Sequence, residues 1–243
     1  MARGAHSRLE WRHRTLDYHI SQVALRYPRT LQRNRATARH QKAVDTATGE
    51  ILGYARWSIP ESHATITTAE SDGNGTPAWP EAVIPAVSAE EETEINRMAA
   101  TAVWDPDLTS DPLLDGMRKI QDPRGHPGLQ DVHEYKPILL TLLTSLIEGA
   151  DTETKRAELE YLAVHPRHQR RGVATALVRS GMRQAEKLDL DIYVHAMKPG
   201  VLVYQRLGFR LERELIQDDT EYGGPGLFGD YFLIYKQPAK PAN

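Results

Sequence analysis

Three arginines lie just before a glycine in the second half of the chain, where Arg167, Arg170 and Arg171 precede Gly172. The pattern predicts a strand that ends, a short basic loop and a helix that begins at once. The first N–H groups of a helix have no partner inside the helix, and together with the helix dipole they favour an anion. Glycine removes a side chain where a phosphate would approach the backbone. The segment therefore predicts a site for a phosphate-bearing cofactor, and a merely basic helix start is the plain alternative.

The elements that would position this loop lie on both sides of it. Leu159–Val164 predicts a strand that Pro166 ends, and Gly172–Leu188 has the spacing of a helix. The pattern continues with a strand over Ile192–Ala196, a helix over Pro199–Leu207 that Gly208 stops, and strands over Phe209–Ile216 and Tyr231–Tyr235. This order predicts an α/β fold with a mixed sheet and helices on its faces.

Three segments in this order resemble the acetyl-CoA signature of the GNAT superfamily of N-acetyltransferases. Residues 162–174 read Leu-Ala-Val-His-Pro-Arg-His-Gln-Arg-Arg-Gly-Val-Ala and contain the family's pattern of Gln or Arg, two residues, Gly, one residue, then Gly or Ala. Tyr204–Phe209 looks like the family's Tyr…Gly-Phe element, and Gly53–Trp57 resembles its earlier strands, particularly in fungal members. The resemblance implies a GNAT fold, in which a central V-shaped mixed β-sheet is flanked by helices, with a long insertion before the central strand.

The resemblance also implies acetyl-CoA as the cofactor and CoA as the product. The strand backbone would bind the pantetheine amides, and one strand N–H, at Val164, would polarise the thioester carbonyl. The loop and the helix start would hold the pyrophosphate. The cofactor-binding residues implied in this way are Leu162, Ala163, Val164, Gln169, Arg170, Arg171, Gly172, Val173, Ala174 and Thr175.

In the implied reaction a neutral amine attacks the thioester directly, and two proton transfers remain. Tyr204 matches the family's general acid, and phenol and thiol pKa values of about 10 and 8.5 make protonation of the thiolate nearly balanced. Glu158 stands six residues before Val164, where histone-type members carry a glutamate base, and Glu160 lies on the same strand face. His195 on the next strand is an outside alternative for the base. A packing tyrosine and exposed strand carboxylates are the plain alternatives.

The first hundred residues predict a hairpin and several helices. Gln41–Asp45 and Ile51–Trp57 form the hairpin strands around a turn at 46–50. Residues 8–35 predict one or two short helices broken near Pro28. Ser88 would cap a helix that runs to about Val103, with Glu91 as its capping-box partner.

The chain of 243 residues is interpreted as a single acetyltransferase domain over 1–243. It consists of a basic N-terminal helical region at 1–40, an insertion at 58–150 and an acetyl-CoA-binding core at 157–236. Within the insertion, 60–82 is expected to be mobile because it is rich in turn formers and poor in apolar anchors. Leu139–Ile147 predicts a helix with one buried side.

Composition excludes some chemistry. The chain has no cysteine, so an acyl group cannot pass through an enzyme thiol. His165 and His168 have no thiol or carboxylate set beside them in the sequence, so no metal site is expected. No stretch has the roughly 18 apolar residues of a membrane span, and neither a membrane nor a nucleic-acid partner is expected. A cytoplasmic protein is the default, and a homodimer is allowed for.

The predicted function is transfer of the acetyl group from acetyl-CoA to a primary amine by direct attack on the thioester. The acceptor is expected to be a small molecule. A protein lysine or N-terminal acceptor is the alternative, and a non-catalytic CoA-binding GNAT module is a second alternative, which the intact Tyr204 disfavours.

Overall fold

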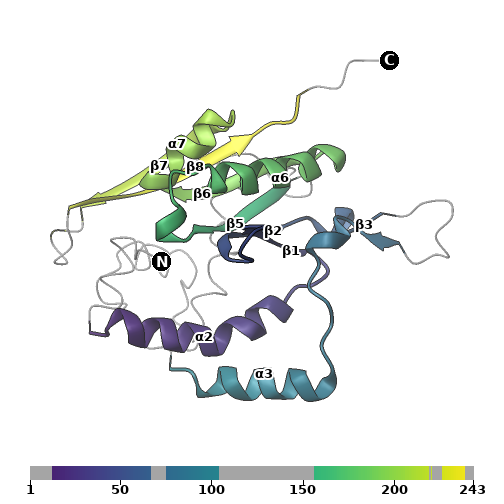
Figure 1. Cartoon of the computed structure of the whole chain (residues 1–243). Coiled ribbons are helices and arrows are strands. Elements are labelled where there is room, and N and C mark those ends of the chain that lie inside the picture. Colours follow the sequence, from purple (N-terminus) through teal and green to yellow (C-terminus); the bar gives the residue numbers. More distant parts are fainter. Residues whose placement is uncertain (1–12, 67–74, 104–155, 219, 221–225, 239–243) are drawn as a thin grey trace, which may run out of the picture.

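The computed structural model describes residues 13–66, 75–103, 156–218, 220 and 226–238, and Figure 1 shows their arrangement. The order of elements predicted for the second half of the chain is confirmed. The predicted helix over Leu139–Ile147 lies outside the described residues. The helices and strands are α2 Leu16–Gln32, β1 Ala38–Val44, β2 Ile51–Ser58, β3 Thr65–Ile66, β4 Thr76–Pro77, α3 Ala89–Thr101, β5 Arg156–Val164, α6 Val173–Lys187, β6 Asp191–Met197, α7 Lys198–Arg206, β7 Arg210–Asp218 and β8 Leu227–Tyr235.

Six strands form one mixed sheet in the order β1-β2-β5-β6-β8-β7. The central pair, β5 and β6, is parallel, and every other neighbouring pair in this sheet is antiparallel. The chain crosses from β5 to β6 through α6, which is the connection that a parallel pair requires. The predicted α/β architecture, a mixed sheet flanked by helices, is therefore confirmed.

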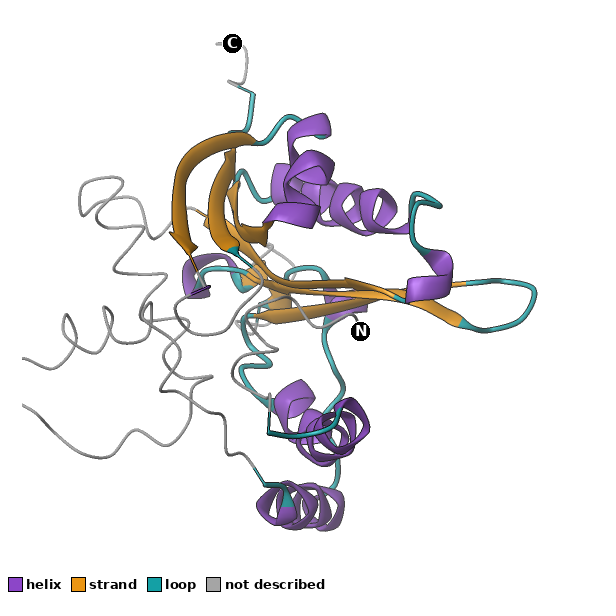
Figure 2. Ribbon diagram, turned by 90° about the vertical axis from the view of Figure 1, so that its left-hand side faces the viewer, coloured by secondary structure: helices purple, strands orange, loops and turns teal. Residues whose placement is uncertain are grey.

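Helices α6 and α7 cover one face of the sheet, and Figure 2 shows them together above the strands. The core on this side is built from alternate residues of β2 and β5 and from one face of α6, including Ala55, Trp57 and Leu177. Trp57 is 1% exposed and lies against Gly181 of α6, where an added Cβ would overlap the indole ring. A glycine at this position is therefore what lets the helix lie close to the sheet.

The opposite face of the sheet is where α2 and α3 lie (Figure 2). Tyr27 of α2 meets Tyr54 of β2 edge-on, with ring centroids 6.1 Å apart, and α3 packs on α2. The expected break near Pro28 is wrong, because α2 runs through Pro28 to Gln32. Proline deletes only its own N–H bond to the carbonyl of Ala24, and the helix ends four residues later, so little hydrogen bonding is lost.

Two local predictions in the first hundred residues are confirmed. The hairpin β1–β2 forms where the sequence placed it, although β1 begins three residues earlier, at Ala38. Ser88 caps α3 in a complete capping box, in which its side chain accepts from the backbone of Glu91 and the Glu91 carboxylate accepts from the backbone of Ser88. This helix ends at Thr101.

The segment that follows β2 is better anchored than its composition suggested. Ala64, Ala78 and Trp79 are buried, and Trp79 packs on Trp57 with ring centroids 6.2 Å apart. The short strands β3 and β4 pair with each other as well. The expectation that 60–82 lacks apolar anchors is therefore wrong for its described parts, and 67–74 lies outside the described residues.

Within the described part of the chain no helix has the length and apolarity needed to cross a membrane.

Candidate functional site

The two central strands separate partway along their length. Pairing between β5 and β6 ends at Leu159 and Val194. Beyond this point β5 continues to pair with β2 as far as Val164, whereas β6 continues to pair with β8 as far as Met197. The facing edges of β5 and β6 therefore lose their mutual ladder, which opens the sheet in a V and leaves strand amides available to a ligand. The predicted stretch Leu162–Val164 lies on this open edge.

A loop with two left-handed residues connects the end of β5 to α6. Residues Pro166–His168 form a 3₁₀ turn, and Arg170 and Gly172 then have φ values of 61° and 80°. Gly172 is the N-cap of α6, and no side chain caps the helix, so the first amides of Val173 and its neighbours have no side-chain partner there. A Cβ at Gly172 would meet nothing within 4 Å, so the backbone at this position faces open space. The predicted stretch Gln169–Thr175 thus has the exposed amides and free approach that a pyrophosphate needs.

Tyr204 lies on α7, on the helix-covered side of the sheet. It is 5% exposed and packs edge-on against Phe209, with ring centroids 5.6 Å apart. A Cβ at Gly200 would lie 3.3 Å from the Tyr204 ring and 4.0 Å from Ala196, so Tyr204 stands near the open end of β6. Burial raises the pKa of Tyr204 well above that of a free phenol, which keeps the hydroxyl protonated.

A histidine–aspartate pair lies on the other face of the sheet, at the point where the strands separate. His195 follows Val194, the last residue of β6 that pairs with β5, and its Nε2 lies 2.5 Å from Oδ1 of Asp230 on β8. The imidazole stacks on Phe232, with ring centroids 5.0 Å apart and 14° between the planes. An acid–base pair therefore stands across the sheet from Tyr204. The sequence kept His195 only as an outside alternative and missed Asp230, although strand alternation places both on one face once β6 and β8 are paired.

The two predicted glutamates lie on this same face, in different surroundings. Glu158 pairs in register with Tyr193, and its charge together with that of Asp230 adds to the effect of burial in raising the pKa of Tyr193. Glu160 lies at an irregularity in the β2–β5 register, and its carboxylate is 2.5 Å from Nε of Arg56. The shared face is confirmed.

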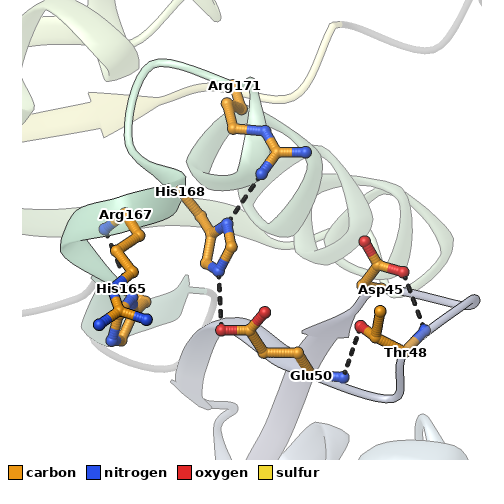
Figure 3. A network of polar contacts seen from close by, with 7 residues as sticks. All are labelled: Asp45, Thr48, Glu50, His165, Arg167, His168 and Arg171. Atoms are coloured by element: carbon orange, nitrogen blue, oxygen red, sulfur yellow. Dashed lines mark hydrogen bonds and ion pairs between the residues drawn. The ribbon is translucent and has the colours of Figure 1, made fainter.

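A polar network joins the loop before α6 to the β1–β2 hairpin, as Figure 3 shows. Nη1 of Arg171 lies 2.8 Å from Nδ1 of His168, and Nε2 of His168 lies 3.0 Å from Oε1 of Glu50. The ligand atoms of Glu50, His165 and His168 all lie within 4.8 Å of one another. The expectation that no carboxylate stands beside the two histidines is therefore wrong, because Glu50 arrives there from the distant hairpin.

The structure thus brings most of the predicted residues to one end of the β5–β6 pair. Strand β5 supplies the open edge together with Glu158 and Glu160 on one face of the sheet. The loop before α6 and the start of α6 supply the cradle, and α7 supplies Tyr204 on the other face. Such a site can hold an extended phosphate-bearing ligand in the opening of the sheet and can exchange protons from both faces. These features define an α/β domain that is suited to group transfer from a nucleotide-linked carrier.

Comparisons with known proteins agree with this class. Residues 132–209 match the family model described as the acetyltransferase (GNAT) family, and the match includes the loop before α6 and Tyr204. Residues 132–209 therefore resemble a GNAT acetyltransferase domain. It is similar to the cysteine-rich protein 2-binding protein of Mus musculus, at 29% identity over 97 residues. That match covers 40% of this chain and 12% of the mouse protein.

Solved structures of acetyltransferases are distant relatives in sequence. A histone acetyltransferase HPA2 and related acetyltransferase from Corynebacterium glutamicum shares 17% identity, with 94% of this chain and 81% of that chain covered and a TM-score of 0.43. A mosquito arylalkylamine N-acetyltransferase like 5b shares 14% identity, with 96% and 87% covered and a TM-score of 0.39.

Proposed function

We propose that this protein transfers the acetyl group of acetyl-CoA to a primary amine. The observation that carries the proposal is the opening between β5 and β6, which has an amide cradle at one end and proton-transfer groups on both faces. The match of residues 132–209 to the GNAT family model supports acetyl transfer in general. The His195–Asp230 pair supports an amine acceptor, because an ammonium ion must lose a proton before it can attack.

The residues present fit acetyl-CoA. The loop Gln169–Gly172 and the first turn of α6, through Thr175, would bind the pyrophosphate with backbone amides, and Arg170 and Arg171 would add charge. The edge of β5 from Leu162 to Val164 would bind the pantetheine amides. Acetyl-CoA would supply an activated thioester carbon and a thiolate leaving group, and the protein would supply orientation and proton transfer.

His195, held by Asp230, is the base that we propose for the amine. Its imidazole lies where β5 and β6 separate, and Asp230 fixes the ring and would stabilise its charged form. Glu158, with its carboxylate facing the same side, is the alternative base. Tyr204 would act from the opposite face and donate its hydroxyl proton toward the sulfur of the leaving thiolate.

The acceptor that we propose is a small-molecule primary amine, and a protein N-terminus or lysine is the alternative. Purified protein, acetyl-CoA and a panel of mono- and polyamines, arylalkylamines, amino acids, N-terminal peptides and lysine peptides would be assayed for thiol release, with mass detection of products. We expect turnover with at least one small amine. Turnover with peptides alone would assign a protein acceptor. CoA binding without turnover on any amine would leave a non-catalytic CoA module and reject the enzymatic proposal.

A further inference from the structure

One side chain of the proposed pyrophosphate cradle is held from outside the cradle loop. Arg171 donates from Nη1 to Nδ1 of His168 at 2.8 Å, and Nε2 of His168 lies 3.0 Å from the Glu50 carboxylate (Figure 3). Glu50 belongs to the turn between β1 and β2, far from the cradle in the sequence. The chain of contacts Glu50–His168–Arg171 is called the hairpin relay below.

The direction of each hydrogen bond in the hairpin relay follows from its members. A guanidinium can only donate, so Nδ1 of His168 accepts, and the ring proton therefore sits on Nε2 and is donated to Glu50. This donation is the first cause of the lowered pKa of Glu50, so the carboxylate is charged. His168 is 8% exposed, and loss of either neighbour would leave a buried ring nitrogen without its partner.

The same atoms do not form a ready metal site. Glu50, His165 and His168 have the ligand types of a zinc centre, with their ligand atoms within 4.8 Å of one another. A metal needs a lone pair on Nε2 of His168, but that nitrogen carries the proton as long as Arg171 donates to Nδ1. Nδ1 of His165 accepts from the backbone of Arg167 at 3.3 Å. The observed arrangement is thus a hydrogen-bond network.

The cradle needs such external support because its backbone is strained. Arg170 has a φ of 61°, a left-handed conformation that costs a non-glycine residue free energy and persists only where surrounding contacts impose it. The hairpin provides two fixed points beside it. The backbone N–H of His165 donates to the carbonyl of Leu52 at 2.9 Å, and the side chain of His168 is bound to Glu50.

We infer that Glu50 and His168 are positioning residues, which hold Arg171 and the loop before α6 in the conformation that binds the pyrophosphate of CoA. The inference rests on the proposed function. It makes the β1–β2 hairpin a part of the cofactor site, although no residue of the hairpin needs to touch the cofactor. Glu50 acts through His168 and Arg171 alone.

For Glu50→Gln, the positioning role and simple electrostatics predict opposite changes in CoA affinity. A carboxylate near a phosphate site repels the ligand, so by Coulomb's law alone Glu50→Gln should tighten CoA binding. If Glu50 positions Arg171, the same substitution should weaken CoA binding, because His168 and Arg171 lose their fixed orientation. The two explanations are therefore separated by the direction of the effect.

Calorimetric titration of the full chain with CoA would measure this direction. We expect Glu50→Gln to raise the dissociation constant roughly five- to twenty-fold at unchanged stoichiometry, which is less than a fully buried charge-assisted hydrogen bond would give because Glu50 is 49% exposed. In an Arg171→Gln background the added Glu50→Gln change should have a smaller effect, because only its support of the loop through His168 remains. Glu94→Gln is the matched control, since Glu94 is 53% exposed against 49% for Glu50 and also accepts from a side-chain donor, that of Arg97 on α3.

Steady-state kinetics would separate positioning from a loss of folded protein. Positioning predicts that Glu50→Gln raises KM for acetyl-CoA by the same factor and leaves kcat unchanged. A lowered binding stoichiometry at unchanged affinity would mean that Glu50 only supports folding, and it would overturn the inference. So would unchanged or tighter binding by Glu50→Gln while the wild type binds CoA.

Two further outcomes keep this inference distinct from its alternatives. If EDTA abolished CoA binding by the wild type and added Zn²⁺ restored it, Glu50, His165 and His168 would be metal ligands and the relay would be overturned. If the wild type bound no CoA in either condition, the proposed function itself would fall and the inference with it. Weaker binding by Glu50→Gln in EDTA, with a smaller effect in the Arg171→Gln background, would establish the relay.

Discussion

At Tyr204 the environment alters the chemistry that the residue type alone suggests. A phenol and a thiol in water exchange a proton at nearly equal free energy. Burial raises the pKa of Tyr204, so full transfer to a thiolate is less favourable than in water. A hydroxyl that stays protonated can still donate a hydrogen bond to sulfur as negative charge develops there. We therefore expect Tyr204 to act in the transition state rather than in binding.

Tyr204→Phe should lower kcat by about 10²–10⁴-fold with little change in CoA affinity, because the ring and its packing remain while the proton donor is lost. Tyr235→Phe is the matched control, since Tyr235 contacts the same Phe209 ring, at 5.4 Å against 5.6 Å for Tyr204. Steady-state kinetics on an identified acceptor would measure both variants. A Tyr204→Phe enzyme that kept more than about half of wild-type turnover, with chemistry limiting, would make Tyr204 a packing residue.

The His195–Asp230 pair makes a separate prediction about the base. His195→Gln should lower kcat/KM by about 10²–10⁴-fold and remove the acid limb of its pH profile, because the group that must be deprotonated is gone. Asp230→Asn should also lower kcat/KM although the imidazole remains, because an amide cannot hold the ring in the tautomer that the base needs. The pH profile of kcat/KM would be measured for each variant. If Glu158→Gln removed the acid limb and His195→Gln kept it, Glu158 would be the base.

The sequence alone predicted those residues of the site that are close together along the chain. The loop Gln169–Gly172 was predicted because the loop and the helix that it starts are one local unit. His195 and Asp230 lie 35 positions apart and meet only through the β6–β8 register, and Glu50 and His168 lie 118 positions apart. Neither spacing has a local signature, so only the folded sheet could show these partners.

Among the elements, the junction of the loop and α6 carries the next prediction. Gly172→Glu should abolish CoA binding, because a carboxylate would stand where the pyrophosphate charge goes. Gly172→Ala is the control. It carries the same strain of about 1 kcal/mol at a φ of 80° without the charge, and its Cβ meets nothing within 4 Å. Calorimetry with CoA should therefore show a smaller loss of binding by the Ala variant, whose methyl group adds bulk at the phosphate approach but no charge. Equal binding by the Glu variant in a folded protein would move the cofactor site elsewhere.

Elements with strong local signals were predicted well, and those that depend on packing were not. The hairpin β1–β2 and the cap of α3 follow from turn and capping chemistry. The continuation of α2 through Pro28 does not follow from local chemistry, because tertiary context overrode a helix breaker. The burial of Trp79 against Trp57 was missed because its neighbours in sequence are turn formers.

For the molecule as a whole, His40 predicts how stability depends on pH. Burial, with smaller contributions from Arg56 and Arg39, lowers the pKa of His40 to about 4. The unfolded chain, in which a histidine has a pKa of about 6.5, therefore binds more protons between pH 6.5 and 4. The stability contributed by His40 is then present above pH 6.5 and is lost as the pH falls toward 4.

Urea unfolding at pH 7.5 and pH 5.0 would test this dependence. Between these values the wild type should lose about 2 kcal/mol of unfolding free energy more than His40→Gln, which has no charge to gain. The carboxylates titrate alike in both proteins and cancel in the comparison. Equal losses in the two proteins would mean that His40 takes up its proton without disturbing the fold.

The register of β2 and β5 has a consequence for how this chain can vary. Ser58 pairs with Glu158, so the two halves of the cofactor side are joined across all of residues 59–157 by strand pairing rather than by chain proximity. Closing a longer connection costs little, because each doubling of its length adds only about 0.6 kcal/mol. Insertions between the two strands therefore cost little stability, provided that buried anchors such as Trp79 are kept. Lineages could therefore lengthen this segment while the edge of β5 and the loop before α6 stay the same.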